Sequence, residues 1–175
     1  MTHWTVTQSI ENPTTALMEG PLFKAKCSSG KKGFIPHLDG KEGDQMTPAG
    51  TYTVRQVFYR PDRISHPHTK VKIDPLSPDL GWCDDPHHKF YNKLVRLPFS
   101  SSHEKLWRED HVYDIIVVIS HNDDPVVPFA GSAVFMHLAR DDFSPTEGCI
   151  AMRLDSMLKF LSMVSVEDPL HFIAS

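Results

Sequence analysis

The chain has 175 residues, the size of one globular domain, and can bury a sizeable core without disulfides or metals. Hydrophobic residues make up 40% and charged residues 23%, which excludes wholesale disorder and a fibrous class. The formal charge of −4 and the scattered Lys and Arg residues exclude the basic stripe of a nucleic-acid-binding protein. We expect a single domain over residues 1–175, and the 14 prolines favour a loop-rich fold with strands.

Cysteine usage and the N-terminal segment set further limits. The three cysteines, Cys27, Cys83 and Cys149, cannot all pair within one chain, so at least one thiol is free unless chains are cross-linked. The N-terminal segment lacks a basic stretch followed by an apolar one, and no window approaches the roughly 18 apolar residues of a membrane span. From the residues alone we expect neither an export signal nor an anchor, which leaves a cytoplasmic protein and a trimmed leader both open.

The N-terminal third reads as β-rich. Alternating apolar residues predict strands at 4–8 and 21–27. The glycine-containing segment 28–33 predicts a turn that leads into Phe34 and Ile35. Residues 47–54 predict a Pro-Gly turn that runs into a strand of β-branched and aromatic residues.

The middle of the chain reads as a long loop followed by a buried strand. Residues 61–102 are rich in prolines and polar residues, which predicts an irregular region with residues 81–86 at its tip. Residues 113–119 include a continuous β-branched run, which is typical of a strand that is buried on both faces. We expect this strand to anchor the core.

Three elements are predicted for the C-terminal part. The apolar run 133–136 predicts a strand that delivers His137 at its end. Residues 154–161 have apolar positions at helical spacing, and Asp155 is placed as the N-cap of that helix. Residues 170–173 predict a closing strand.

The segment around Cys149 has the local features that a nucleophile needs. Gly148 permits backbone angles that turn amide N–H groups toward a reacting carbonyl oxygen, as in an oxyanion hole. His137 lies upstream, and the loop between them can bring its imidazole to the sulfur as a general base. The alternative is that Cys149 is a small buried hydrophobe and His137 a structural histidine. The Pro, Thr, Glu and Gly before the cysteine favour a catalytic turn.

Four motifs carry a resemblance to a known family. The run Phe135-Met136-His137 followed by Thr146-Glu147-Gly148-Cys149-Ile150 resembles the His and Ser/Thr-x-Gly-Cys signature of YkuD-like L,D-transpeptidases. Three further motifs resemble a proteobacterial branch of that family, in family order: Glu42-Gly43-Asp44 before Thr47-Pro48-Ala49-Gly50, then Trp82-Cys83-Asp84-Asp85-Pro86, then Asn122-Asp123-Asp124-Pro125. The resemblance extends from about Gly30 to Leu161.

This resemblance implies a mainly β (α+β) catalytic domain, a sandwich or barrel with a few short helices, one of them after the cysteine. It implies that Cys149 attacks the L-centre carbonyl of a diaminopimelate residue in a peptidoglycan stem peptide, with His137 as base and the Gly148 backbone in the oxyanion hole. D-Ala would leave a thioester, which an amine converts into a cross-link or water hydrolyses, as in an L,D-carboxypeptidase. No cofactor is implied.

The resemblance also implies partners and a location. The partners are donor and acceptor stem peptides, carbapenems are expected to acylate Cys149, and a monomer is the default oligomeric state. The resemblance places such an enzyme in the periplasm or cell envelope.

The chain departs from the better-known family members beside the cysteine. Glu147 stands where they have His, and Ala151 stands where they have Arg. We therefore expect Glu147 to alter the charge at the pocket mouth, and Arg153 or Arg140 to bind a substrate carboxylate. The candidate substrate-binding residues are Thr146, Glu147, Arg153, Arg140, Trp82, Asp84, Asp85 and His121.

Two alternatives stay open for the acidic loop. Asp84 and Asp85 beside Trp82 can bind the ammonium group of diaminopimelate, or they can simply form an Asx turn before Pro86. A zinc site from neighbouring residues such as His87 and His88 is disfavoured, because their spacing matches no known zinc motif. For the whole chain, the alternative from another class is a catalytically silent module that binds the cell wall.

Overall fold

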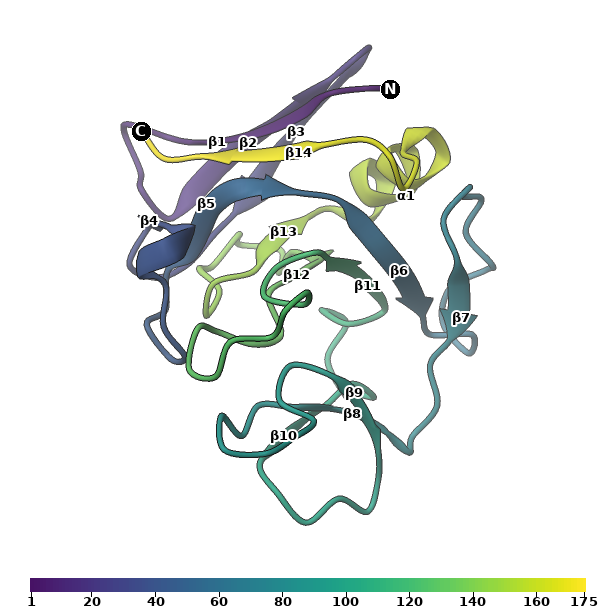
Figure 1. The fold of residues 1–175 in the computed structure, drawn as a ribbon. Coiled ribbons are helices and arrows are strands. Elements are labelled where there is room, and N and C mark those ends of the chain that lie inside the picture. The colour runs from purple at the N-terminus through teal and green to yellow at the C-terminus, as the bar shows by residue number, and fades with distance from the viewer.

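Strands dominate the computed structural model, which describes all residues from 1 to 175 (Figure 1). The strands of the large sheet are β1 (Trp4–Gln8), β2 (Thr15–Gly20), β3 (Phe23–Ser28), β4 (Phe34–Pro36), β5 (Thr47–Tyr52), β6 (Val54–Tyr59), β7 (Ile73–Pro75), β11 (Ile115–Ile119), β12 (Phe135–Leu138), β13 (Ile150–Met152) and β14 (Leu170–Ile173). The strands of the small sheet are β8 (Leu80–Cys83), β9 (Leu94–Arg96) and β10 (His103–Lys105).

The large sheet has the strand order β4-β5-β14-β1-β2-β3-β13-β12-β11-β6-β7, and the small sheet has the order β10-β8-β9. The large sheet is open, because its end strands β4 and β7 do not pair with each other, so the expected barrel is not closed. Instead of several short helices there is one α-helix, α1 (Leu154–Met163), and one 3₁₀ turn, η1 (His37–Asp39). As expected, the helix follows the segment that contains Cys149. Neither helix is long and apolar enough to cross a membrane.

The N-terminal predictions are partly confirmed. The strand at 4–8 is β1, but the strand predicted at 21–27 begins at Phe23, because Pro21 and Leu22 form the turn that joins it to β2. Leu22 has a φ of 56°, a conformation typical of tight turns. The turn predicted within 47–54 is wrong, since Thr47 already lies in β5 and pairs with Phe34 of β4.

The central strands follow the predicted order with shifted ends. Strand β11 is confirmed as a buried strand, and β14 is confirmed as the closing strand. His137 lies within β12 and not at its end. Asp155 is not the N-cap of α1: the chain turns at Arg153 directly after β13, so Arg153 is the N-cap and Asp155 lies in the first turn. There its negative charge is favourably placed near the helix N-terminus.

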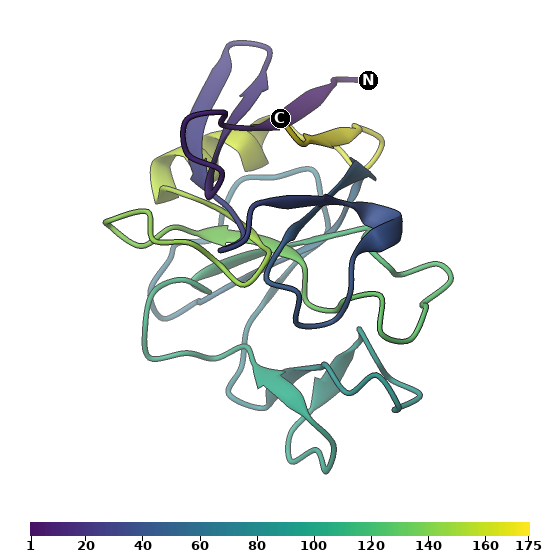
Figure 2. The ribbon, with the colours of Figure 1, turned by 90° about the vertical axis from the view of Figure 1, so that its left-hand side faces the viewer.

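The region predicted as irregular contains β8 and β9 of the small sheet, and β10 follows directly after it. Residues 81–83 lie in β8, the central strand of that sheet, and do not form the tip of a loop. Figure 1 shows the small sheet as a separate layer beside β11 and β12, and Figure 2 shows the same arrangement from the side. Trp82 packs edge-on against Phe135 of β12, with ring centroids 4.9 Å apart, and so joins the two sheets.

The two faces of β12 and β13 serve different purposes. Met136, Leu138, Ile150 and Met152 belong to the main hydrophobic core, which the buried face of α1 also joins. Because side chains alternate along a strand, the intervening residues point to the opposite face, toward the small sheet. That second face carries His137.

Candidate active site

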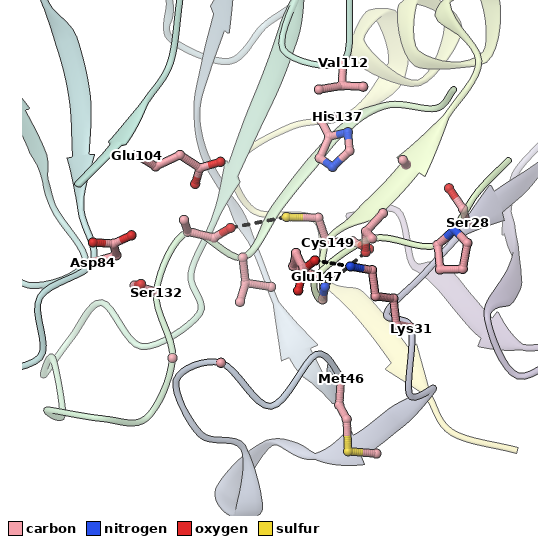
Figure 3. A pocket seen from close by; sticks show the side chains of 18 of the residues that line it. Ser28, Lys31, Met46, Asp84, Glu104, Val112, Ser132, His137, Glu147 and Cys149 are labelled. Atoms are coloured by element: carbon pink, nitrogen blue, oxygen red, sulfur yellow. Dashed lines mark hydrogen bonds and ion pairs between the residues drawn. The ribbon is translucent and has the colours of Figure 1, made fainter. Parts of the chain in front are cut away.

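Strand pairing determines how His137 and Cys149 face each other. Strands β12 and β13 are parallel, with Met136 opposite Ile150 and His137 opposite Ala151. Cys149 immediately precedes β13 and shares the parity of Ala151, so it points to the same face as His137. Figure 3 shows both side chains directed into one cavity.

The Cys149 thiol is buried and bonded to the backbone. Its Sγ donates to the carbonyl of Ala133 at 3.2 Å and accepts from the N–H of Phe135 at 3.3 Å. Burial raises the pKa of Cys149 to about 12; the Phe135 N–H lowers this pKa, and the carboxylates of Glu104 and Glu147 raise it. The resting thiol is therefore protonated at neutral pH.

His137 is neutral and oriented by its own strand. Its Nδ1 lies 3.0 Å from the Leu138 carbonyl, which accepts a hydrogen bond when Nδ1 carries the proton. This tautomer leaves Nε2 without a proton and able to act as a base. Burial lowers the pKa of His137 to about 4. The Tyr113 ring packs edge-on against the imidazole, with centroids 5.4 Å apart.

The loop before Cys149 is held in a strained, tightly bonded form. Gly148 has a φ of +139°, and a Cβ at this position would lie 2.7 Å from the Met46 carbonyl oxygen. Only glycine fits such a backbone. The Thr146 hydroxyl accepts from the Gly148 N–H at 3.1 Å and donates to the Cys149 carbonyl at 2.7 Å. The buried Thr47 hydroxyl donates to the Gly148 carbonyl at 2.9 Å and accepts from the Gly30 N–H at 2.9 Å.

This bonding distinguishes the backbone amides of Gly148 and Cys149. The Gly148 N–H is already bonded to Thr146, whereas the Cys149 N–H has no hydrogen-bond partner. The Cys149 amide is thus the donor that is free to meet a developing negative charge beside its own sulfur.

A cavity of about 680 Å³ surrounds these groups. It brings together seven of the residues predicted from the sequence: Cys149, His137, Gly148, Thr146, Glu147, Arg140 and Asp84. Glu147 lies at its rim, largely exposed, and bonds to Lys31 and Gln45 (Figure 3). Lys31 therefore offsets part of the negative charge that Glu147 was expected to bring to the mouth of the cavity.

Four predicted residues do not line this cavity. Trp82 is buried between the sheets and donates its indole N–H to Asn92 at 2.9 Å. Asp85 accepts from the backbone N–H of His87 at 2.9 Å, which is the Asx-turn alternative. His121 is buried against Tyr52, and Arg153 lies over the Phe143 ring. Their predicted substrate contacts therefore stay predictions, and in this structure each of the four side chains is engaged outside the cavity.

Several cavity residues were missed by sequence reasoning: Glu104, Tyr113, Arg108, Ser132, Lys31 and Glu42. Glu42 stood in a quoted motif without a role. Glu104 gave no signal, because it lies in β10, a short polar strand just beyond the region 61–102 that was expected to be irregular.

The structure contains no set of side chains that could bind a metal ion. No group of three His, Cys, Asp or Glu side chains converges to hold an ion. Cys83 is a buried free thiol in β8, and Cys27 and Cys149 are also free.

The model of the YkuD L,D-transpeptidase catalytic domain family matches residues 6–171. The chain belongs to this family, as the motifs predicted. Two solved structures are similar to it: an L,D-transpeptidase from Mycobacterium smegmatis (17% identity, TM-score 0.44, covering 98% of this chain and 58% of that one) and L,D-transpeptidase 1 from Mycobacterium tuberculosis (14% identity, TM-score 0.43, covering 97% and 58%). This chain therefore spans less than two thirds of either mycobacterial chain. No curated protein matches the sequence.

Proposed function

We propose that residues 1–175 form a cysteine-dependent L,D-transpeptidase that acts on peptidoglycan stem peptides. The observation that carries the proposal is the shared cavity: Cys149 and His137 both line it from neighbouring strands, and the backbone N–H of Cys149 itself has no other hydrogen-bond partner. A nucleophile, a base and an oxyanion donor are the three parts that acyl transfer needs. Membership of the YkuD family supports stem peptides as the substrate.

The first half of the proposed reaction is acylation. Nε2 of His137 takes the thiol proton while Sγ attacks the carbonyl carbon of the diaminopimelate L-centre. The Cys149 N–H donates to the tetrahedral oxyanion. His137 then gives the proton to the leaving nitrogen, the C–N bond breaks, and D-Ala departs from a thioester.

Before substrate binds, the Cys149 thiol and the His137 imidazole are both neutral. The thiol proton therefore moves to the imidazole as the bond from sulfur to carbon forms, and no thiolate–imidazolium pair exists beforehand. The second half of the reaction uses an amine from another stem, which attacks the thioester and forms a cross-link at diaminopimelate. Water attacking the same thioester gives the L,D-carboxypeptidase outcome. Arg140, at the cavity, is the cation that we assign to a substrate carboxylate.

The same site has two wider consequences. Carbapenems carry an activated carbonyl, and we expect them to acylate Cys149 by the same attack. The proposed substrate also places the working protein in the cell envelope.

A silent cell-wall-binding module is the second candidate. Its supporting observation is the raised pKa of Cys149, which makes the resting thiol a poor nucleophile. A turnover measurement distinguishes the two candidates, because only the enzyme converts a stem peptide into products.

The test is incubation with a purified disaccharide-tetrapeptide, followed by mass spectrometry of the products. The wild type is expected to release D-Ala and to form dimers or tripeptides, and Cys149→Ala is expected to do neither. Cys83→Ala is the matched control, because Cys83 is also a buried free thiol but does not line the cavity. No product from the wild type, or equal product from Cys149→Ala, would overturn the proposal.

A further inference from the structure

A row of three side chains crosses the large sheet beside the nucleophile. Strand pairing sets His137 of β12 opposite Ala151 of β13, and Ala151 opposite Ser28 of β3. Side chains that are paired across neighbouring strands point to the same face, so Ser28 lies on the face that carries His137 and Cys149. The sequence neighbours of the three paired residues belong to the main core on the other face: Cys27, Met152, Met136 and Leu138.

The three paired residues line an inner recess of the cavity. Ser28, Ala151 and His137 all contribute to its lining, but their exposed fractions are only 0%, 1% and 8% (Figure 3). The loop before Cys149 runs alongside the end of β3, because the Thr146 N–H donates to the Ser29 carbonyl at 2.9 Å. The recess formed by Ser28, Ala151 and His137 is therefore suited to a small molecule and not to a peptide chain.

Ser28 brings an unused polar group to this recess. Its Oγ atom is buried and has no hydrogen-bond partner in the protein, whereas the hydroxyl of the neighbouring Ser29 donates to the Pro13 carbonyl at 3.5 Å. A hydroxyl can donate one hydrogen bond and accept others, and burying it without a partner is unfavourable. Buried polar atoms of this kind are commonly bonded to an ordered water molecule. The recess thus has the chemistry of a water site.

Ala151 leaves room for water between the two polar side chains. Neighbouring strands lie about 4.8 Å apart, so the Cα atoms of Ser28 and His137 are about 10 Å apart with only a methyl group between them. A short chain of water molecules spans such a gap. Ala151 also lies two residues after Cys149 on the same face, so the recess begins about 7 Å along the strand from the nucleophile.

We propose that this recess holds the water molecule that hydrolyses the thioester, and that Ser28 is the residue that positions this water. The inference rests on the proposed function, because it concerns the second half of that reaction. It assigns a structural basis to the L,D-carboxypeptidase outcome: water is already bound beside the acyl group before an amine from another stem can enter.

The proposed step conserves every proton. Nε2 of His137 takes a proton from the water while the water oxygen bonds to the carbonyl carbon of the thioester, and the Cys149 N–H donates to the oxyanion. The C–S bond then breaks, and the imidazolium returns the proton to the sulfur. The products are a free thiol and a carboxylic acid. Ser28 forms no bond to the substrate and acts only through the water that it orients.

The experiment measures how the thioester divides between water and an amine. Wild type and variants are incubated with a tetrapeptide donor and a fixed concentration of glycinamide, and mass spectrometry gives the ratio of the acid product to the amide product. This ratio does not depend on how fast the thioester forms, so a purely structural effect on acylation does not change it. Ser28→Ala is expected to lower the ratio about 3- to 10-fold, the effect of losing one neutral hydrogen bond.

Two further variants complete the series. Ala151→Val fills the recess, keeps the Ser28 hydroxyl and should also lower the ratio. Ser29→Ala is the matched control, because Ser29 is equally buried but does not line the cavity, and it should leave the ratio unchanged. An unchanged ratio in both Ser28→Ala and Ala151→Val would overturn the role of the recess and leave acyl transfer standing.

A crystal structure of the wild type tests the water site without turnover. It is expected to show an ordered water molecule within hydrogen-bonding distance of Ser28 Oγ, and a recess without water would overturn the proposal. No D-Ala release from the wild type would overturn acyl transfer itself, and with it the hydrolytic role of a water found there.

Discussion

His137 and Cys149 project from neighbouring parallel strands onto one face of the sheet, yet each side chain is hydrogen-bonded to the backbone and not to the other. The imidazole is fixed by Leu138, and the thiol is fixed between Ala133 and Phe135. Both side chains therefore already share one cavity before substrate binds, but the thiol and the imidazole are both neutral. In the proposed reaction, the imidazole therefore has to take the thiol proton during the attack itself.

The first prediction concerns alkylation of the free protein. Because burial raises the pKa of Cys149 to about 12, the thiolate is scarce at pH 7.5, and iodoacetamide should modify Cys149 at least about 100-fold more slowly than an unhindered free thiol. The rate should rise steadily between pH 9 and 11. Peptide mapping after timed quenching measures it, and a rate at pH 7.5 that matches a free thiol would mean that an ion pair already exists.

The second prediction concerns stability in acid. The folded-state pKa of His137 is lowered from 6.5 to about 4, so the unfolded chain binds this proton first as the pH falls. Stability from this group is present above pH 6.5 and is lost toward pH 4, by up to about 3 kcal/mol. Glu42 and Glu104 have raised pKa values and act in the opposite sense.

Because these carboxyl groups oppose the effect of His137, the acid stability of the wild type must be compared with that of a variant that lacks the imidazole. Urea unfolding at pH 7.5 and pH 4.5 should show a smaller loss of free energy for His137→Gln than for the wild type. Equal losses for the two proteins would contradict the lowered pKa.

The third prediction concerns the strained loop. Gly148→Ala places a methyl group 2.7 Å from the Met46 carbonyl at a φ of +139°, and it should cost about 1–3 kcal/mol and displace Cys149. Gly43→Ala is the matched control, because Gly43 has a φ of +75° but nothing lies within 4 Å of its added methyl. Gly43 also lines the cavity, so Gly43→Ala should cost about 1 kcal/mol but lower turnover far less than Gly148→Ala, because Cys149 keeps its position. Thermal unfolding and D-Ala release measure both effects, and equal turnover in the two variants would be inconsistent with this role.

The fourth prediction concerns Thr47, whose hydroxyl group is hydrogen-bonded to the same loop. Thr47→Val leaves the buried Gly30 N–H and the Gly148 carbonyl without their partner, which should destabilise the fold by about 2–3 kcal/mol and lower kcat. Thr51→Val removes an exposed hydroxyl from the same strand and should change stability by less than about 0.5 kcal/mol. Similar losses in the two variants would show that Thr47 has no special role.

The local pattern of the sequence predicted much of the fold and the centre of the site. Strand β11 is a continuous β-branched run, and the motif around Cys149 carries Gly148, whose backbone only glycine adopts. Features of this kind depend on a few adjacent residues and can therefore be predicted from the sequence. The family was recognised for the same reason, since its motifs are short and contiguous.

The misses have physical causes that adjacent residues do not reveal. Strand β10 is short and polar, so Glu104 gave no periodic signal, and its place in the cavity depends on pairing with β8. Asp85 and Arg153, which were predicted to contact the substrate, lie outside the cavity: Asp85 caps a turn, and Arg153 lies over an aromatic ring. Which of several charged side chains lines a cavity is decided by long-range packing.

The most direct test of the central claim is the intact mass of the protein after brief incubation with a tetrapeptide donor and an acid quench, which preserves a thioester. We predict that the wild type gains the mass of the donor less D-Ala, with the adduct mapped to Cys149, and that Cys149→Ala gains nothing. A wild-type protein that keeps its original mass while D-Ala is released, or an adduct that survives in Cys149→Ala, would contradict acyl transfer through this residue.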